Sequence, residues 1–409
     1  MGGGLLQLVA YGAQDVYLTG NPQITFFKVV YRRHTNFAIE AIQQTFNGNP
    51  AFGQRVTSTI ARSGDLINRA YLVVNTAGLT GNLCNYFGLR LINYVEVEIG
   101  GQKIDKHYSH WMYIWNELSL PSSKQQGWYE MVGGAGGSAG NTYYVPLEFW
   151  FCRNVGLALP LIGLQYHEVK INLLFEDAAA CVQDATAITG TFDASLWVDY
   201  IYLDTDERRK FAQASHEYLI EQLQFTGKEA AQSKIKLNFN HPCKEIVWVA
   251  TKQAAQWTDT PEANNNWFNY TTNAAVSSTT VADSAYTSMS AALANHSISS
   301  KNPIAKGKLI LNGNDRFSER NGNYFNLVQP FQHHENVPSN AGINVYSFAL
   351  KPEEHQPSGT LNMSRIDTST LDLTYTSGVS TSTHDMNIYA VNYNVLRILS
   401  GMGGIAYSN

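Results

Sequence analysis

The sequence predicts an all-β protein built from antiparallel sandwiches, and three observations support this. Apolar and polar side chains alternate in many short segments, as in residues 95–99, where valine and isoleucine on one face oppose two glutamates on the other. Such alternation indicates strands with one buried and one solvated face. Turn dipeptides recur between these segments, and helical periodicity is rare.

The chain opens with a predicted arm that leads into a short helix over residues 22–34. Asn21 is a suitable N-cap, and Pro22 suits the first helical position because it has no N–H to lose. Two arginines and His34 then stand at the end of the segment, where the helix dipole favours cations.

Alternating segments predict strands in both halves of the chain. They are residues 95–99, 169–175, 196–203, 218–225, 234–239 and 371–375. Gly100-Gly101 predicts a two-residue hairpin turn into a strand that begins at Gln102. Asn-Gly pairs at 47, 312 and 321 mark further turns.

Two segments have helical character. Residues 107–119 place His107 and four large apolar side chains on one stripe, namely Trp111, Ile114, Trp115 and Leu118. A shorter helix is predicted from Thr205, where two acidic residues precede three basic ones. Because this helix separates two strand-rich halves, we predict four segments. They are an arm with a short helix (residues 1–34), a first β domain (35–205), a linker helix (206–215) and a second β domain (216–409).

Two segments are predicted to be projecting loops. Residues 131–142 are dense in glycine, and residues 254–303 are rich in Asn, Thr, Ser and Ala with weak patterning. So long a loop is expected to be functional or mobile, and to lie exposed at one end of a sandwich.

The composition narrows the class of protein. Only 15% of residues are charged, whereas 23 Tyr, 18 Phe and 8 Trp are present, a balance that suits a protein contacting other chains. The net charge of −5 and the lack of a Lys/Arg run argue against direct nucleic-acid binding. Four scattered cysteines predict buried free thiols, and no signal peptide or membrane-spanning run is expected.

Two strings match functional motifs but lack the required context. Residues 136–140 fit G-x-S-x-G, yet a strand is predicted where a nucleophile elbow needs a helix. Residues 401–406 fit a dinucleotide fingerprint, yet only three residues follow where a helix should offer its N-terminus. We therefore expect no catalytic residue and no cofactor.

Histidines and carboxylates cluster at three places: His107 with His110, residues 333–335 and residues 353–355. No spacing supplies a third metal ligand, so no metal site is expected. Pro352 and Pro357 flank the third group, which is therefore predicted to lie at a corner between strands and to organise loops. A catalytic carboxylate pair is the minority interpretation, because adjacent residues rarely converge on one bond.

Three Asn-x-Ser/Thr sequons are candidate glycosylation sites, at Asn269, Asn295 and Asn362. The first two fall in the predicted long loop and are the better candidates by exposure. Modification at any one of them is not expected for a chain without a signal peptide.

Several long strings resemble, in the right order, the double jelly-roll major capsid proteins of nucleocytoplasmic large DNA viruses. They include the opening, the string Tyr-Ser-Phe-Ala-Leu-Lys-Pro-Glu-Glu-His-Gln-Pro-Ser-Gly-Thr and the C-terminal string, and they cover residues 12–34, 63–74, 146–169, 206–222, 346–360 and 394–407. The resemblance covers nearly the whole chain, except for residues 254–303.

This resemblance implies two consecutive eight-stranded jelly rolls per chain and three chains per capsomer, which tiles an icosahedral shell. It implies minor capsid and penton proteins as partners, and an N-terminal side near an internal membrane. The chain would be a virion component, assembled in the host cytoplasm, rather than an enzyme.

Two other functions stay open on the sequence. A jelly-roll carbohydrate-binding or host-attachment protein would use exposed aromatic side chains, for which Trp257 and Trp267 in the long loop are candidates. A β-sandwich hydrolase is the third interpretation, with no convergent motif behind it.

Overall fold

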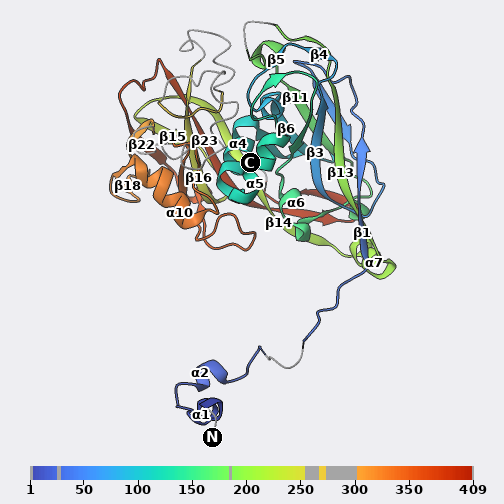
Figure 1. The fold of residues 1–409 in the computed structure, drawn as a ribbon, viewed down its shortest axis with the longest axis vertical. Coiled ribbons are helices and arrows are strands. Elements are labelled where there is room, and N and C mark those ends of the chain that lie inside the picture. The colour runs from blue at the N-terminus through green and yellow to red at the C-terminus, as the bar shows by residue number, and fades with distance from the viewer. Residues whose placement is uncertain (1–2, 25–28, 184–186, 254–266, 273–301, 408–409) are drawn as a thin grey trace. The chain divides into compact units, whose positions relative to one another are not determined.

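The computed structural model describes residues 3–24, 29–183, 187–253, 267–272 and 302–407. They divide into two compact units, Met1–Phe37 and Ala38–Asn409 (Figure 1).

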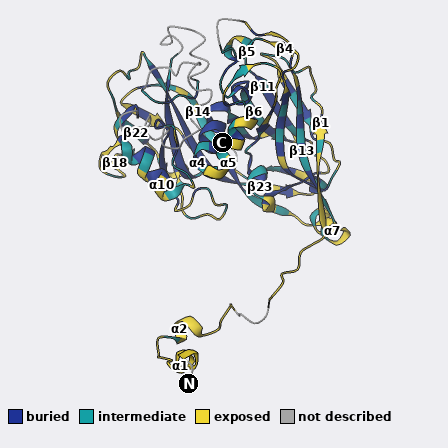
Figure 2. Cartoon of the chain, viewed as in Figure 1, coloured by how far each residue is buried: buried dark blue, intermediate teal, exposed yellow. Residues whose placement is uncertain are grey.

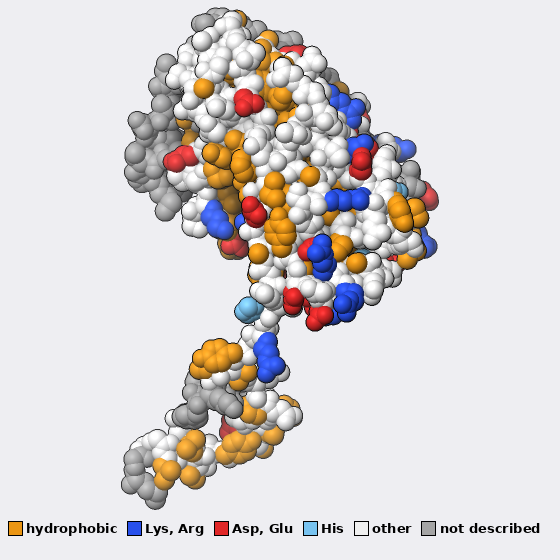
Figure 3. Space-filling model, turned by 90° about the vertical axis from the view of Figure 1, so that its right-hand side faces the viewer, with side chains coloured by type: hydrophobic (Ala, Val, Ile, Leu, Met, Phe, Trp, Pro, Cys, Tyr) orange, Lys and Arg blue, Asp and Glu red, His pale blue; other side chains and the backbone are white. Residues whose placement is uncertain are grey.

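The N-terminal unit has two short helices, α1 (Gly3–Val9) and α2 (Val16–Thr19). None of its described residues is buried, and hydrophobic side chains lie on its surface (Figure 3). The helix predicted over residues 22–34 is wrong for the described residues 22–24 and 29–34, which have no regular structure, and Asn21 has a left-handed φ of 50° instead of capping a helix. A short helix with no buried face has too little stabilisation to persist, and this segment is rich in β-branched and aromatic residues.

The first sandwich pairs two antiparallel sheets. The outer sheet contains β1 (Phe37–Gln44), β13 (Asp193–Leu203), β3 (Leu66–Asn75), β9 (Thr142–Pro146) and β10 (Leu159–Pro160). The inner sheet contains β2 (Arg55–Thr59), β11 (Val169–Phe175), β6 (Ile92–Ile99) and β7 (Gln102–Tyr108).

The second sandwich is built the same way. Its inner sheet contains β14 (His216–Ala230), β23 (His384–Leu399), β16 (Pro242–Lys252), β20 (Asn344–Ser347), β21 (Leu361–Asn362) and β24 (Met402–Ile405). Its outer sheet contains β15 (Lys234–Leu237), β22 (Ser369–Tyr375), β17 (Ile304–Leu311), β18 (Asn314–Asp315) and β19 (Arg320–Asn321). When the two-residue strands are set aside, each sandwich has eight strands in the described residues, which is the predicted number.

The alternating segments of the sequence are strands, and the predicted hairpin is present. β6 and β7 pair across Gly100 and Gly101, whose φ angles of 56° and 84° are both left-handed. Two such residues in succession suit the primed turn that matches the twist of the strands, and glycine adopts them without strain. The segment predicted over 234–239 is shorter, because β15 ends at Leu237.

Helices are few. The longest are α4 (Ser109–Ser119), α5 (Ser122–Met131) and α7 (Thr205–Gln213). The shorter ones are α3 (Phe87–Arg90), α6 (Trp150–Arg153), α10 (Gln329–His333) and the single turns η1 (Val155–Leu157), η2 (Leu161–Gly163), η3 (Ala178–Ala180), η6 (Tyr324–Val328) and η7 (Met363–Arg365). Two-residue strands complete the fold: β4 (Leu79–Thr80), β5 (Asn82–Leu83), β8 (Gly137–Ser138) and β12 (Thr189–Gly190). The helix predicted from Thr205 is confirmed, with the Asp204 side chain accepting a hydrogen bond from the Thr205 amide.

Within the inner sheet of the second sandwich, β16 is buried on both faces. Figure 2 shows buried residues concentrated between the two sandwiches. On β16, Val247 and Val249 belong to the hydrophobic core of the first sandwich, whereas Ile246 and Trp248 belong to that of the second. α4 lies between the sandwiches, with Trp111 5.5 Å from the Tyr389 ring (Figure 1). The hydrophobic core of the first sandwich therefore includes side chains from the second sandwich. Because the two sandwiches share this core, the predicted division into separate β domains stays a prediction.

The predicted loops are only partly described. Residues 131–142 contain turns and β8, as expected of a loop. Most of residues 254–303 lie outside the described residues, but 267–272 are described and contradict an exposed loop, since Phe268 and Tyr270 are buried. Their rings pack against α4, where Tyr113 stacks 4.8 Å from Phe268. Within the described residues, no helix has the length and hydropathy needed to cross a membrane.

Candidate functional site: a buried charge network

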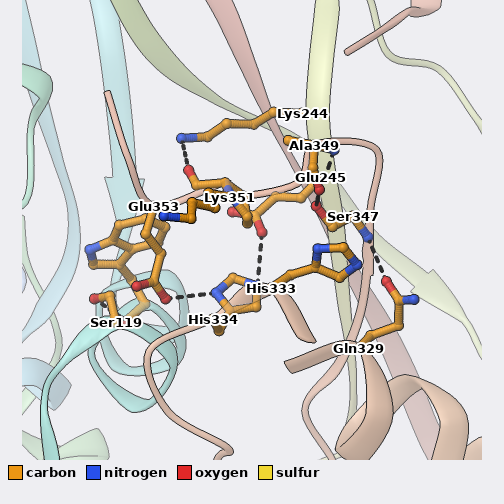
Figure 4. Close-up of polar contacts among 12 residues, drawn as sticks. Ser119, Lys244, Glu245, Gln329, His333, His334, Ser347, Ala349, Lys351 and Glu353 are labelled. Carbon is orange, nitrogen blue, oxygen red and sulfur yellow. Dashed lines mark hydrogen bonds and ion pairs between the residues drawn. The ribbon is translucent and has the colours of Figure 1, made fainter. Parts of the chain in front are cut away.

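Three cations and three carboxylates meet, largely buried, where the two sandwiches adjoin. Figure 4 shows four of them, Lys244, Glu245, His334 and Glu353. We call this set the junction network; its members are Arg153 at the end of α6, Glu221 on β14, Lys244 and Glu245 on β16, His334 after α10, and Glu353 in the turn after β20. Most charges this deeply buried are stable only when paired, and here each has a partner.

Glu221 accepts two cations at once. One carboxylate oxygen lies 2.9 Å from the Arg153 guanidinium and the other 2.7 Å from the Lys244 ammonium. Lys244 is fully buried and also donates to the Pro352 carbonyl. The Arg153 guanidinium also lies 3.8 Å over the Trp115 ring of α4. Because Glu221 is on β14, the ion pair of Arg153 with Glu221 ties the first sandwich to the second.

His334 lies between two carboxylates. Its Nε2 is 3.1 Å from Glu245, and its Nδ1 is 2.8 Å from Glu353 (Figure 4). Burial, the largest single influence, lowers its pKa, but the two carboxylates together outweigh burial and raise the pKa of His334 to about 9. For Glu245, burial works to raise the pKa, and the charge and hydrogen bond of His334 outweigh it, so the pKa of that carboxyl is lowered. Both side chains are therefore ionised at neutral pH.

Glu353 also orders the chain around it. Its carboxylate accepts a hydrogen bond from the Glu335 amide, while Glu354, next to it, faces outward and pairs with Lys351 at 2.7 Å. The Phe348 amide donates to the Lys244 carbonyl and holds the start of the turn on β16. The prediction that residues 353–355 lie at a corner between strands and organise loops is confirmed for Glu353.

A second acidic group lines a small cavity beside the network. Asp105 pairs with His107 at 2.9 Å and accepts a hydrogen bond from the Leu223 amide of β14, and the half-buried Glu148 lines the same cavity. Burial raises the pKa of Glu148, opposed mainly by Arg153. This group therefore also joins elements of the two sandwiches.

The histidine pair of the sequence does not lie on one helix. His107 is on β7, where its ring stacks 4.6 Å from Phe149, and His110 is on α4, 2.8 Å from the Tyr270 hydroxyl. The helical stripe predicted from residue 107 is therefore wrong in its first two residues, which extend the preceding strand. Across the described ranges, no three His, Cys, Asp or Glu side chains are grouped as metal ligands would be.

The two motif strings are strand and turn. Residues 137–138 form β8, which pairs with β5, and β9 follows rather than a helix. Residues 402–405 form β24, which pairs with the end of β23 across a turn with left-handed Ser400 and Gly401. Neither string has the helix that its motif requires.

The candidate modification and sugar-binding residues have unequal exposure. Asn269 is half-buried and Asn362 is exposed, which contradicts the expectation that Asn269 is the better exposed of the two; Asn295 lies outside the described residues. Trp267 stacks 4.8 Å from His110, and the Arg90 guanidinium lies 3.8 Å over its ring, so it packs onto the body of the protein instead of presenting a ring to a sugar. Trp257 lies outside the described residues.

The cysteines are free thiols, as predicted. Three are buried and Cys152 is intermediate, and burial raises the pKa of the Cys84 and Cys152 thiols to about 12. Such thiols are poor nucleophiles.

Sequence reasoning did not find Arg153, Glu221 and Lys244. One signal was present: Lys244-Glu245 interrupts the apolar run of β16, and two charges inside a strand that is buried on both faces need partners. Their partners come from other elements of the fold, Glu221 from β14 and His334 from the segment after α10, and no local pattern specifies these pairings.

Comparison with known families gives two matches that together span most of the chain. Residues 25–204 match the model described as the major capsid protein N-terminus. Residues 207–404 match the model described as the large eukaryotic DNA virus major capsid protein.

Individual relatives agree over the full length. The chain is 53% identical to the major capsid protein of Pyramimonas orientalis virus and 46% identical to that of Paramecium bursaria Chlorella virus 1, each over 100% of both chains.

Among solved structures, PBCV-1 VP54, which has been fitted into a reconstruction of the virophage Sputnik, superposes with a TM-score of 0.78 at 41% identity over 94% of this chain and 100% of that one. A quasi-atomic model of the PBCV-1 capsid gives a TM-score of 0.75 at the same identity and coverage. The Faustovirus major capsid protein gives 0.74 at 14% identity over 95% of this chain and 94% of that one, which shows the shared fold.

Proposed function

Because the chain belongs to the major capsid protein family of large eukaryotic DNA viruses, we propose that three copies associate into a pseudo-hexagonal capsomer that tiles an icosahedral shell. The fold is a double jelly roll, and the chain is a structural component of the virion capsid. The trimer and its outline are the proposed part.

One observation carries this proposal. Two sandwiches of eight strands stand side by side in one compact unit, joined through a shared core and the junction network. Three such copies place six similar blocks around one axis, which gives a near-hexagonal outline that fills a surface with few gaps. Contacts between neighbouring tiles can then each be weak, because every tile has many neighbours.

Sedimentation of the purified full-length chain tests the proposal. At micromolar concentration we expect one species with three times the 45.4 kDa mass of the chain, and a near-hexagonal outline in electron micrographs. Only 45.4 kDa species at that concentration would contradict it.

The further partners are proposals of the same kind. We propose that the shell of which this chain is part also holds minor capsid and penton proteins, that it assembles in the host cytoplasm, and that the chain has neither enzymatic activity nor direct nucleic-acid contact. The composition supports the last point, with a net charge of −5 and no basic run.

We also propose that the N-terminal unit is a contact element on the inner side of the shell, toward an internal membrane or a minor protein. All its described large apolar side chains are exposed, among them Leu6 and Leu8 at 71% and 79%. Exposed apolar side chains at this density mark an interaction segment. Arg32 and Arg33 lie in the same unit, and an anionic surface would favour such cations.

Glycosylation is expected at none of the three sequons, and intact-mass measurement of protein from virions tests this. The bare chain mass of 45.4 kDa is the expected result. Should a glycan be present, the exposed Asn362 is the better site of the two described sequons, since Asn269 is half-buried. Peptide mapping that places a glycan on Asn269 would contradict this order.

A further inference from the structure

The outer sheet of the first sandwich has an aromatic outward face where a solvated sheet would be polar. Its inward residues fill the core, and its outward residues include four large apolar side chains that stand together on β3, β9 and β13. We call these four the outer aromatic face; they are Tyr71, Val73, Tyr144 and Trp197. An antiparallel sheet with one solvated face normally alternates apolar and polar residues, so this face departs from the pattern.

Strand register makes this face continuous. Trp197 is directly opposite Tyr71, and Val73 is directly opposite Tyr144. The two tyrosine rings are 6.5 Å apart, and Tyr144 is 44% exposed. Figure 3 faces this flank and shows hydrophobic side chains in a broken band across the globular unit.

The outer sheet of the second sandwich has the opposite character. There Lys234 and Lys308 flank Asp372 in register across three strands. A lysine-bearing face suits solvent, whereas aromatic residues without lysine are typical of the centre of a protein interface. The outer sheet of the first sandwich is therefore suited to contact with protein, and the outer sheet of the second is suited to contact with solvent.

A second apolar patch lies on the opposite flank of the same unit, at α10 (Figure 1). Phe331 is 80% exposed, and Val328 lies three residues before it on the same helical face. Leu350 is 71% exposed and lies beside them, since its carbonyl bonds the His333 ring. We call Val328, Phe331 and Leu350 the α10 patch.

We propose that the outer aromatic face of one copy docks onto the α10 patch of the next copy, and that three such contacts close the ring; this rests on the proposed trimer. A closed ring of identical chains is built from contacts between two different surfaces of each chain, and these two patches are different surfaces of one compact unit. Charged side chains border both patches: Arg69 and Asp199 at the outer aromatic face, and the ion pair of Lys351 and Glu354 at the α10 patch, so each rim can offer one cation and one anion to the other.

Two charge substitutions test the pairing. Tyr144→Glu alters only the outer aromatic face, and Phe331→Glu alters only the α10 patch; both side chains are exposed enough for the fold to tolerate the change. We expect each variant alone to be monomeric, with the concentration needed for trimer raised about a hundredfold or more. Lys236→Glu, on the exposed lysine face, is the matched control and should remain a trimer.

Mixing the two variants then distinguishes this geometry from others. Each Tyr144→Glu copy keeps an intact α10 patch and each Phe331→Glu copy keeps an intact outer aromatic face, so native mass spectrometry should find 1:1 dimers and no trimers. Three results would each overturn the inference. They are trimers from either variant alone, dimers of Phe331→Glu alone, and a mixture that stays monomeric although far-UV circular dichroism shows that both variants are folded. A monomeric unsubstituted protein would instead overturn the proposed trimer, and these two failures are therefore distinguishable.

Discussion

Replacing Glu221 with glutamine should lower the free energy of unfolding by about 3–5 kcal/mol, the range for breaking a buried ion pair from one side. The substitution keeps the shape of the side chain and removes one charge. It leaves the ammonium of Lys244, which is fully buried, and the guanidinium of Arg153 without the carboxylate that both contact. Urea unfolding at a fixed protein concentration measures the loss, because an assembling protein has concentration-dependent stability.

The same strand supplies the control. Glu217 on β14 forms an ion pair with Arg397 in which both side chains are about 60% exposed, at 63% and 59%. Glu217→Gln should cost less than about 1 kcal/mol, because solvent screens exposed pairs. If Glu221→Gln and Glu217→Gln lowered the free energy of unfolding equally, burial would not explain the contribution of the junction network to stability.

A second substitution separates the unpaired charge from other effects. Adding Lys244→Met to Glu221→Gln removes the buried ammonium as well, and an apolar side chain of similar length suits its fully buried position. We expect the double variant to recover part of the lost stability, since the cost lies in a buried charge without its partner. A double variant less stable than Glu221→Gln would contradict this account.

Local patterns predicted the strands well because their cause is local. The alternation along β6, the two glycines of its hairpin and the charges around Thr205 each require only neighbouring residues. The helix over 22–34 failed for the complementary reason: capping residues were present, but nothing buries its apolar side, and a cap alone contributes only about 1 kcal/mol.

The junction network could not be derived from the sequence in the same way. Arg153, Glu221, Lys244 and His334 are brought together by strand register and by the packing of two sandwiches. The sequence placed His334 and Glu353 in two separate charged groups and did not connect them. Their contact at 2.8 Å depends on how α10 and the turn after β20 sit on β16.

The strand that contributes to both cores, β16, has a recognisable sequence pattern. A strand that is apolar on both faces, like β16, has a different pattern from the alternating strands around it, with burial continuous from Cys243 to Thr251. Such a run indicates a strand covered on both sides. It therefore marks the sheet on which the two sandwiches meet, and the two charges within it mark where they are joined.

Raising the pH from 6.5 to 9 should destabilise the protein, and His334→Gln should remove most of that dependence. The pKa of His334 is about 9 in the fold against 6.5 for an unperturbed histidine, so the folded state binds the proton more tightly. A raised pKa contributes stability that is complete below pH 6.5 and is lost as the pH rises through 9. The shift corresponds to on the order of 3 kcal/mol.

The opposite sign holds for Glu245. Its pKa is lowered in the fold from 4.5, so its contribution is present above pH 4.5 and is lost as the pH falls further. The pair Glu245–His334 is therefore most stabilising between about pH 4.5 and 6.5. In that window both side chains of the pair are charged in the fold.

Urea midpoints of the unsubstituted chain and of His334→Gln, measured at the same protein concentration from pH 6 to pH 10, test this account. The unsubstituted protein should lose stability across that range, whereas the variant should start lower at pH 6 and change little. His333→Gln is the matched control, because its ring bonds the Leu350 carbonyl rather than a carboxylate, and it should keep the full dependence. If His334→Gln retains the alkaline loss, another group carries it, and the two carboxylates around His334 do not hold a proton there.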